Sequence, residues 1–101
     1  ISSGYRIGPF EVENSLMEHP AVAEAAVIGV PDDQRGQIVK AYVVPVEPPE
    51  NPEKTLDELQ SHVRERLARH AYPRELELID ELPTTATGKI QRYRLEEREG
   101  T

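Results

Sequence analysis

The sequence predicts a small α+β domain, in which a three-stranded sheet is covered by two or three helices and preceded by a short N-terminal strand or hairpin segment. Two apolar runs rich in β-branched residues indicate strands, and amphipathic segments before and after them indicate helices. The length of 101 residues suits one domain with one small core. We therefore expect residues 1–101 to form a single domain.

The first helix is predicted within GPFEVENSLMEHP, residues 8–20. Pro9 suits the first helical position, because the N–H that proline lacks has no partner there. Glu11 and Glu13 fall in the first turn, where the helix dipole favours negative charge, so we interpret both as structural. The helix should end at His19-Pro20, because the residue before a proline disfavours helical backbone.

Two strands are predicted next, at residues 22–30 and 38–46, where β-branched residues are frequent. The seven residues between them, PDDQRGQ, have the composition of a hairpin connection. Lys40 lies inside the second strand, and we interpret it as structural. Residues 45–54 contain four prolines in ten positions and should form a loop.

A second helix is predicted after this proline-rich loop. Thr55 and Glu58 have the spacing of a capping box, which would start the helix. Tyr72-Pro73 should end it. Residues 75–82, ELELIDEL, resemble a third strand, and the charged tail RYRLEEREG is compatible with a short third helix. One face of the second helix carries an apolar stripe: Leu56, Leu59, Val63 and Leu67.

Composition excludes several classes of function. A net charge of −7 argues against nucleic-acid binding, which needs a basic face. The chain has no cysteine, so a thiolate nucleophile is excluded and a cytoplasmic location is favoured over a secreted one. No apolar run approaches the ~20 residues that a membrane-spanning helix needs. Three histidines are scattered along the chain, and we predict no metal site.

The segment PTTATGKIQR, residues 83–92, has the composition of a surface loop. Its Lys89 is one of only three lysines in a chain with nineteen acids, and it lies in a window without acids that also holds Arg92 and Arg94. Such a window is a candidate anion site. Gly88 would allow a positive φ or a close approach to a ligand. A P-loop is excluded, because the first glycine and the final Ser or Thr are missing. From composition alone, an anion site and a solvated lysine remain equally possible.

The stretch SSGYRIGPFEVE is also unusual, because two glycines bracket YRI directly before a helix. One interpretation is a turn, a short strand and a helix start. The other is a backbone that passes close to a narrow ligand while Arg6 faces an anion. The residues themselves do not decide between the two.

Taken together, SGYRIGPFEVE, HPAVAEAAVIGVPDDQRGQIVKAYVV and ELPTTATGKIQR resemble the C-terminal domain of the adenylate-forming enzymes. This superfamily comprises acyl-CoA synthetases, peptide-synthetase adenylation domains and luciferases. The three blocks follow the order and spacing of the family, and the resemblance extends from Ser2 to about Leu95. The first two blocks are most similar to medium-chain acyl-CoA synthetases.

The resemblance implies a two-step reaction. A carboxylic acid and Mg-ATP give an acyl-adenylate and pyrophosphate, and the thiol of CoA then displaces AMP. ATP, AMP, CoA and Mg²⁺ would be bound mainly by a large N-terminal domain that is absent from this chain, which begins at Ile1 without a methionine. The small domain would rotate between the steps, and alone it should be inactive. The implied location is the cytoplasm, or the mitochondrial matrix in a eukaryote.

The resemblance also implies roles for five residues. Lys89 matches the adenylation lysine, which bridges the carboxylate and the α-phosphate. Gly4 and Tyr5 match the loop that lines the pantetheine tunnel, and Arg6 matches an arginine near the nucleotide phosphate. Arg64 matches an arginine near the CoA nucleotide in acetyl-CoA synthetases. A protein acetyltransferase is a further implied partner, since acetylation would neutralise the Lys89 ammonium.

Two alternative functions compete with this hypothesis. A peptide-synthetase adenylation domain would deliver its product to a carrier-protein thiol, but the medium-chain-like GYRIGPFEVE argues against it. A stand-alone binding or interaction module would have lost catalysis. The presence of Lys89, Gly4 and Arg6 argues against that loss.

Overall fold

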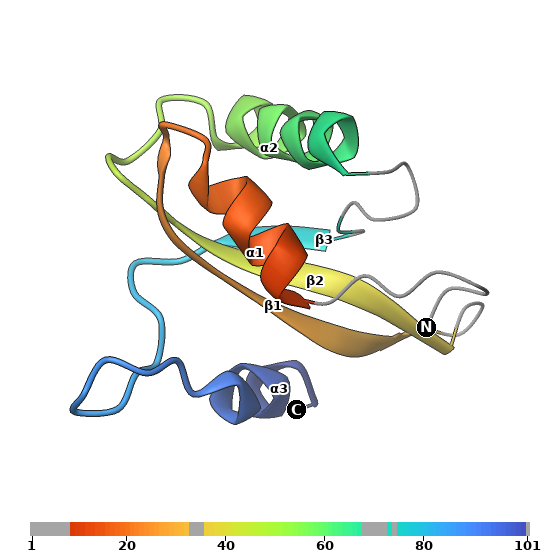
Figure 1. Cartoon of the computed structure of the whole chain (residues 1–101), viewed down its shortest axis with the longest axis vertical. Helices are drawn as coiled ribbons and strands as arrows, with labels where there is room; N and C mark the ends of the chain where they lie inside the picture. The colour runs from red at the N-terminus through yellow and green to blue at the C-terminus, as the bar shows by residue number, and fades with distance from the viewer. Residues whose placement is uncertain (1–8, 33–35, 68–72, 74, 101) are drawn as a thin grey trace.

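Figure 1 shows a twisted sheet with two helices on one face and a third helix on the other. The structure, a computed structural model, describes residues 9–32, 36–67, 73 and 75–100. Its elements follow in the order α1 (Pro9–Met17), β1 (Val22–Asp32), β2 (Gly36–Pro45), α2 (Pro52–Arg66), β3 (Glu75–Leu78) and α3 (Arg92–Gly100). The predicted α+β class, with three strands and three helices, is confirmed. The predicted N-terminal strand or hairpin lies outside the described residues.

The sheet has the strand order β1-β2-β3, so β2 is central. β1 and β2 pair antiparallel as a hairpin, whereas β3 runs parallel to β2 after the crossover through α2. The pairing of β1 with β2 continues to Asp32 and Gly36, so the connection is shorter than the seven residues predicted. Pro31 is tolerated within the longer strand because β1 lies at the edge of the sheet.

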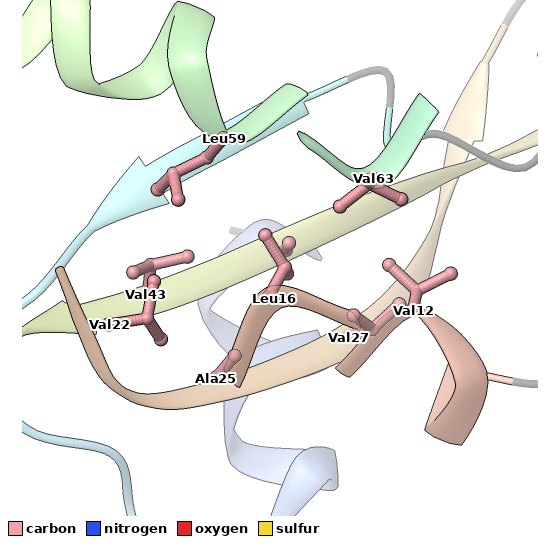
Figure 2. Packing of buried hydrophobic residues seen from close by; sticks show 9 residues of the cluster. Val12, Leu16, Val22, Ala25, Val27, Val43, Leu59 and Val63 are labelled. Atoms are coloured by element: carbon pink, nitrogen blue, oxygen red, sulfur yellow. The ribbon is translucent and has the colours of Figure 1, made fainter. Parts of the chain in front are cut away.

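Side chains alternate along each strand and therefore point to both faces of the sheet. Helices cover both faces, so each face contributes to a buried cluster. Figure 2 shows the cluster under α1 and α2, in which Leu16, Leu59 and Val63 are fully buried. The full cluster is Val12, Leu16, Val22, Ala25, Val27, Ala41, Val43, Leu59 and Val63. The cluster under α3 is Ala26, Ile28, Val30, Tyr42, Leu82 and Leu95. Covering both faces explains why the strands are continuous apolar runs rather than alternating ones.

The second helix begins earlier than predicted. Its N-cap is Asn51, whose side chain accepts a hydrogen bond from the Lys54 N–H (3.2 Å), and Pro52 follows at the first helical position. The predicted capping box at Thr55 is therefore wrong, because an asparagine followed by proline already provides a favourable helix start. The predicted end of this helix at Tyr72-Pro73 is also wrong, since the helix ends at Arg66. The predicted apolar stripe is confirmed for Leu59, Val63 and Leu67, whereas Leu56 is half-buried and is not part of the cluster.

The third strand is shorter than predicted. It pairs with β2 only over Glu75–Leu78, and the last link is the Ile79 N–H to the Val43 carbonyl (2.9 Å). The chain then crosses to the other face of the sheet, where Leu82 is buried in the cluster under α3. Burial of Leu82 therefore directs the end of ELELIDEL away from the sheet.

Among the described residues, no helix is long and apolar enough to cross a membrane.

Candidate functional site

The segment predicted as a surface loop is a small hairpin, which we call the Lys89 hairpin (residues 83–91). Thr84 and Ile90 form an antiparallel bridge across it. Three backbone hydrogen bonds close it: Thr85 N–H to Lys89 O (2.8 Å), Gly88 N–H to Thr85 O (2.9 Å) and Gln91 N–H to Pro83 O (2.8 Å). This pattern is typical of a three-residue hairpin loop whose last residue is left-handed. The segment is thus exposed, as predicted, but its backbone is internally bonded.

Gly88 occupies that left-handed position, with φ +89°. A Cβ built on Gly88 would meet nothing within 4 Å. The glycine is therefore required by its backbone conformation rather than by a lack of space. The positive φ proposed for Gly88 from the sequence is confirmed.

Lys89 directly follows this glycine and is exposed. Its backbone N–H donates to the Thr85 hydroxyl (3.1 Å), which adds to the bond between the Thr85 N–H and the Lys89 carbonyl. Its ammonium makes no hydrogen bond or ion pair with any part of the chain that the structure describes. The backbone of Lys89 is therefore held while its charge is presented outward.

Apolar packing and an ion pair attach the two ends of the Lys89 hairpin to the rest of the domain. Leu82, just before it, is buried, and Ile90 packs against the cluster under α3. Arg92, just after it, begins α3 and pairs with Glu13 of α1 (Nη2 to Oε1, 2.6 Å). The hairpin therefore projects from a base that combines apolar burial with an ion pair between two helices.

The sequence does not predict this ion pair. Its patterns indicate Arg92 as part of a candidate anion site and Glu13 as a partner of the helix dipole, but in the structure the two neutralise each other. Glu13 is buried, and it also accepts a hydrogen bond from the Val27 N–H (2.8 Å). Partners 79 positions apart leave no local signal in the sequence. Glu13 is structural, as predicted, although through tertiary contacts.

The far end of α3 is held by a second ionic cluster. The Lys40 ammonium, which is almost buried, donates to Glu77 (3.0 Å) and Glu99 (2.6 Å). The Tyr42 hydroxyl also donates to Glu99. Arg98 pairs with Glu77 (2.7 Å). The structural role predicted for Lys40 is confirmed, since it joins β2 to β3 and α3.

The ionisation of these groups follows from their contacts. Burial alone would lower the pKa of Lys40, but hydrogen bonds to Glu99 and Glu77 outweigh burial and raise it above its usual value. Burial, together with the hydrogen bond to Glu99, raises the pKa of Tyr42 to about 12. Hydrogen bonds from Lys40 and Tyr42 lower the pKa of Glu99. At neutral pH the cluster is therefore a charged Lys40 between carboxylates.

Of the other predicted site residues, Arg64 is the one that the structure describes, and it does not lie at the Lys89 hairpin. Gly4, Tyr5 and Arg6 lie outside the described residues. Arg64 is exposed on α2, whereas the hairpin leads into α3 on the opposite side of the sheet (Figure 1). Lys89 and Arg64 therefore belong to different faces of the domain. The described ranges contain no group of three or more His, Cys, Asp or Glu that could hold a metal ion.

Comparison with known protein families gives a match to the AMP-binding enzyme C-terminal domain over residues 11–89. The chain belongs to this family. The matched range covers most of the chain and includes the Lys89 hairpin up to its lysine. The resemblance inferred from the three sequence blocks is thereby confirmed.

Relatives of this domain are acyl-CoA synthetases. The chain is 56% identical to human mitochondrial acyl-coenzyme A synthetase ACSM4 over 101 residues, which is 98% of this chain and 17% of that protein. The crystal structure of Brucella canis acyl-CoA synthetase matches with a TM-score of 0.90 and 53% identity, over 97% of this chain and 18% of that one.

A third relative was solved with its reaction intermediate. The o-succinylbenzoate CoA synthetase of Bacillus subtilis, in complex with an acyl-adenylate, matches with a TM-score of 0.81 and 40% identity, over 95% of this chain and 19% of that one. The chain thus spans about a sixth to a fifth of the length of these relatives.

Proposed function

We propose that this chain is the mobile C-terminal domain of a two-domain, ATP-dependent acyl-CoA synthetase, which converts a carboxylic acid, ATP and CoA into acyl-CoA, AMP and pyrophosphate. One observation carries this proposal: in a domain of this family, Lys89 stands on a bonded hairpin and its ammonium has no partner in the described chain. The similarity to ACSM4 favours a medium-chain enzyme.

Lys89 would act in the first step. A carboxylate oxygen attacks the α-phosphorus of ATP, the bond to the leaving pyrophosphate breaks, and the two reacting groups are both anionic. An ammonium between them offsets their repulsion and stabilises the charge that develops. Because the hairpin backbone is already ordered, little reorganisation is needed when the acid and ATP are presented by the other domain.

The second step would use other residues of the domain, among them Arg64 on the opposite face of the sheet. We propose that Gly4 and Tyr5 line the passage of the pantetheine arm, and that Arg6 and Arg64 contact phosphates of the nucleotide and of CoA. The placement of Arg64 and Lys89 on different faces of the sheet supports a domain that rotates between steps. A rotating domain can withdraw Lys89 once the acyl-adenylate has formed.

The remaining partners follow from this scheme. Mg²⁺ would accompany ATP on the large domain. The curated relative ACSM4 is mitochondrial, and we propose the mitochondrial matrix for this protein in a eukaryote and the cytoplasm otherwise. Exposure of Lys89 makes it accessible to a protein acetyltransferase, and acetylation would remove the charge used in the first step.

The central test is Lys89→Ala in the two-domain enzyme. Acyl-adenylate formation, measured by pyrophosphate exchange, should fall by about a hundred- to a thousandfold. Thioester formation from supplied acyl-adenylate should stay within about twofold of wild type, because Lys89 is not used in that step. Near-normal pyrophosphate exchange in this variant would refute the proposed role.

Gly4→Leu tests the opposite step. A bulky side chain in the pantetheine passage should leave pyrophosphate exchange intact and abolish CoA-dependent turnover. Persistence of both half-reactions would exclude the role of Gly4 in CoA access. As a further control, the 101-residue chain alone should fold and produce no acyl-CoA.

A further inference from the structure

Three side chains from two helices meet at the base of the Lys89 hairpin. The guanidinium of Arg92 binds both oxygens of Glu13, with Nη2 at 2.6 Å from each and Nε at 3.1 Å from Oε2. The ring of Phe10 lies against the same guanidinium, 4.9 Å from its central carbon to the ring centroid. A planar cation that is bound along its edge and covered on its face has little freedom to rotate.

Glu13 connects Arg92 to the sheet. Its side chain is only 7% exposed, and one oxygen also accepts the Val27 N–H from the edge strand β1 (2.8 Å). Arg92 is thus attached through one carboxylate to both α1 and β1. This carboxylate therefore links the start of α3 to the edge of the sheet.

Arg92 lies three residues after Lys89, and the bond between Gln91 and Pro83 closes the hairpin between them. Ile90, which is only partly buried, also attaches this strand of the hairpin to the domain. Apolar contact resists separation but is not directional. A charge-assisted, forked hydrogen bond fixes direction as well as distance. The tilt of the Lys89 hairpin on the domain therefore depends on the Arg92–Glu13 pair.

We propose that Arg92, held by Glu13 and Phe10, is a positioning residue for Lys89. The inference rests on the adenylation role proposed above and adds to it: Arg92 touches no substrate and acts through the placement of the lysine. A shift of about 1 Å in a group that bridges two reacting anions is enough to lower the rate by one to two orders of magnitude.

The test uses Arg92→Met in the two-domain enzyme, which keeps an unbranched apolar stem and removes the guanidinium that binds Glu13. The kcat of adenylation should fall by about tenfold or more, while the KM values for ATP and the acid stay within about twofold. Thioester formation from supplied acyl-adenylate should be unchanged. Arg92→Lys keeps the charge and should give an intermediate loss, because an ammonium cannot bind the carboxylate as a fork.

Arg94→Met is the matched control. Arg94 is exposed two residues further along α3, and its ring contact is with Tyr93 (5.8 Å) rather than with α1. The control should leave both half-reactions within about twofold of wild type.

The decisive measurement places Arg92→Met in the Lys89→Ala background. If Arg92 acts through Lys89, the second substitution should have no further effect on adenylation. An equal fall of both half-reactions in Arg92→Met and Arg92→Lys would indicate a purely structural pair and would overturn the inference. If Lys89→Ala impairs adenylation but the Arg92 variants behave like Arg94→Met, the inference fails and the proposed function stands. Normal adenylation in Lys89→Ala would overturn both.

Discussion

Lys40 and Lys89 are two of the chain's three lysines, and they lie in opposite electrostatic surroundings. Lys40 is held within hydrogen-bonding distance of Glu77 and Glu99, with its side chain 9% exposed. Lys89 is exposed on a hairpin, and no described residue pairs with its ammonium. The backbones of both residues are nevertheless held by hydrogen bonds, one in a central strand and one in the hairpin.

The two lysines differ in where the partners of their charges lie. The partners of Lys40 are inside the domain, so its charge contributes to folding. The backbone around Lys89 is ordered at a conformational cost, yet the charge itself gains nothing from the part of the chain that the structure describes. This contrast is what the proposed role of Lys89 requires, since its partners would then lie outside the domain. The contrast can be tested by substituting each lysine in turn and measuring both the stability of the domain and the rate of adenylation.

The largest effect on stability is expected at Lys40. Lys40→Met should lower the free energy of unfolding of the 101-residue chain by about 3 kcal/mol, because it leaves Glu77 and Glu99 without their central cation. For a domain of this size the melting temperature should fall by more than about 10 °C. Thermal and urea unfolding measure both quantities.

Lys89→Met is the matched comparison and should change the free energy of unfolding by less than about 0.5 kcal/mol. In the two-domain enzyme the ranking should reverse: adenylation per folded molecule should be lost in Lys89→Met and retained in Lys40→Met. Equal destabilisation by the two substitutions would remove the distinction between the structural and the functional lysine.

A smaller effect is expected from alkaline pH. An unfolded tyrosine loses its proton near pH 10, whereas burial and the hydrogen bond to Glu99 raise the pKa of Tyr42 to about 12 in the fold. The folded chain therefore holds a proton that the unfolded chain has lost, and stability should fall by about 2 kcal/mol as pH rises from 10 to 12. Lys40, whose pKa is also raised in the fold, acts in the same direction.

Urea unfolding across this range tests the assignment. Tyr42→Phe should flatten the dependence on pH, because it removes the titrating group. Tyr93→Phe is the control, since Tyr93 is 52% exposed and its hydroxyl is not part of the cluster. A pH dependence that is unchanged in Tyr42→Phe would assign the alkaline loss to other groups.

An effect smaller than the alkaline loss of stability is expected from the glycine of the Lys89 hairpin. Gly88→Ala should lower the free energy of unfolding by about 1 kcal/mol, because φ is +89° at a position where an L side chain is strained. Hydrogen exchange should become faster at the amides of Thr85 and Gly88, which close the turn. Ala86→Ser, in the same exposed turn, should change neither quantity. Unchanged exchange in Gly88→Ala would show that the turn does not depend on its glycine.

Much of the fold could be predicted because its signals are local. The β-branched runs of β1 and β2, the apolar stripe of α2 and Pro9 at the start of α1 each report on their neighbours in sequence. One error came from a competing local signal and the other from tertiary packing. Asn51-Pro52 started α2 ahead of Thr55, and the burial of Leu82 ended β3 early.

The sequence by itself determined the fold class and the family and singled out Lys89 as the candidate catalytic residue, since these inferences depend on residue types and spacings along the chain. Only the tertiary structure decided which charges are used internally. It paired Arg92 with Glu13 across 79 positions and enclosed Lys40 between Glu77 and Glu99, while it left the ammonium of Lys89 facing outward. The reason is physical: charges interact through space, and a sequence does not state which distant side chains the packing of helices on a sheet will bring together.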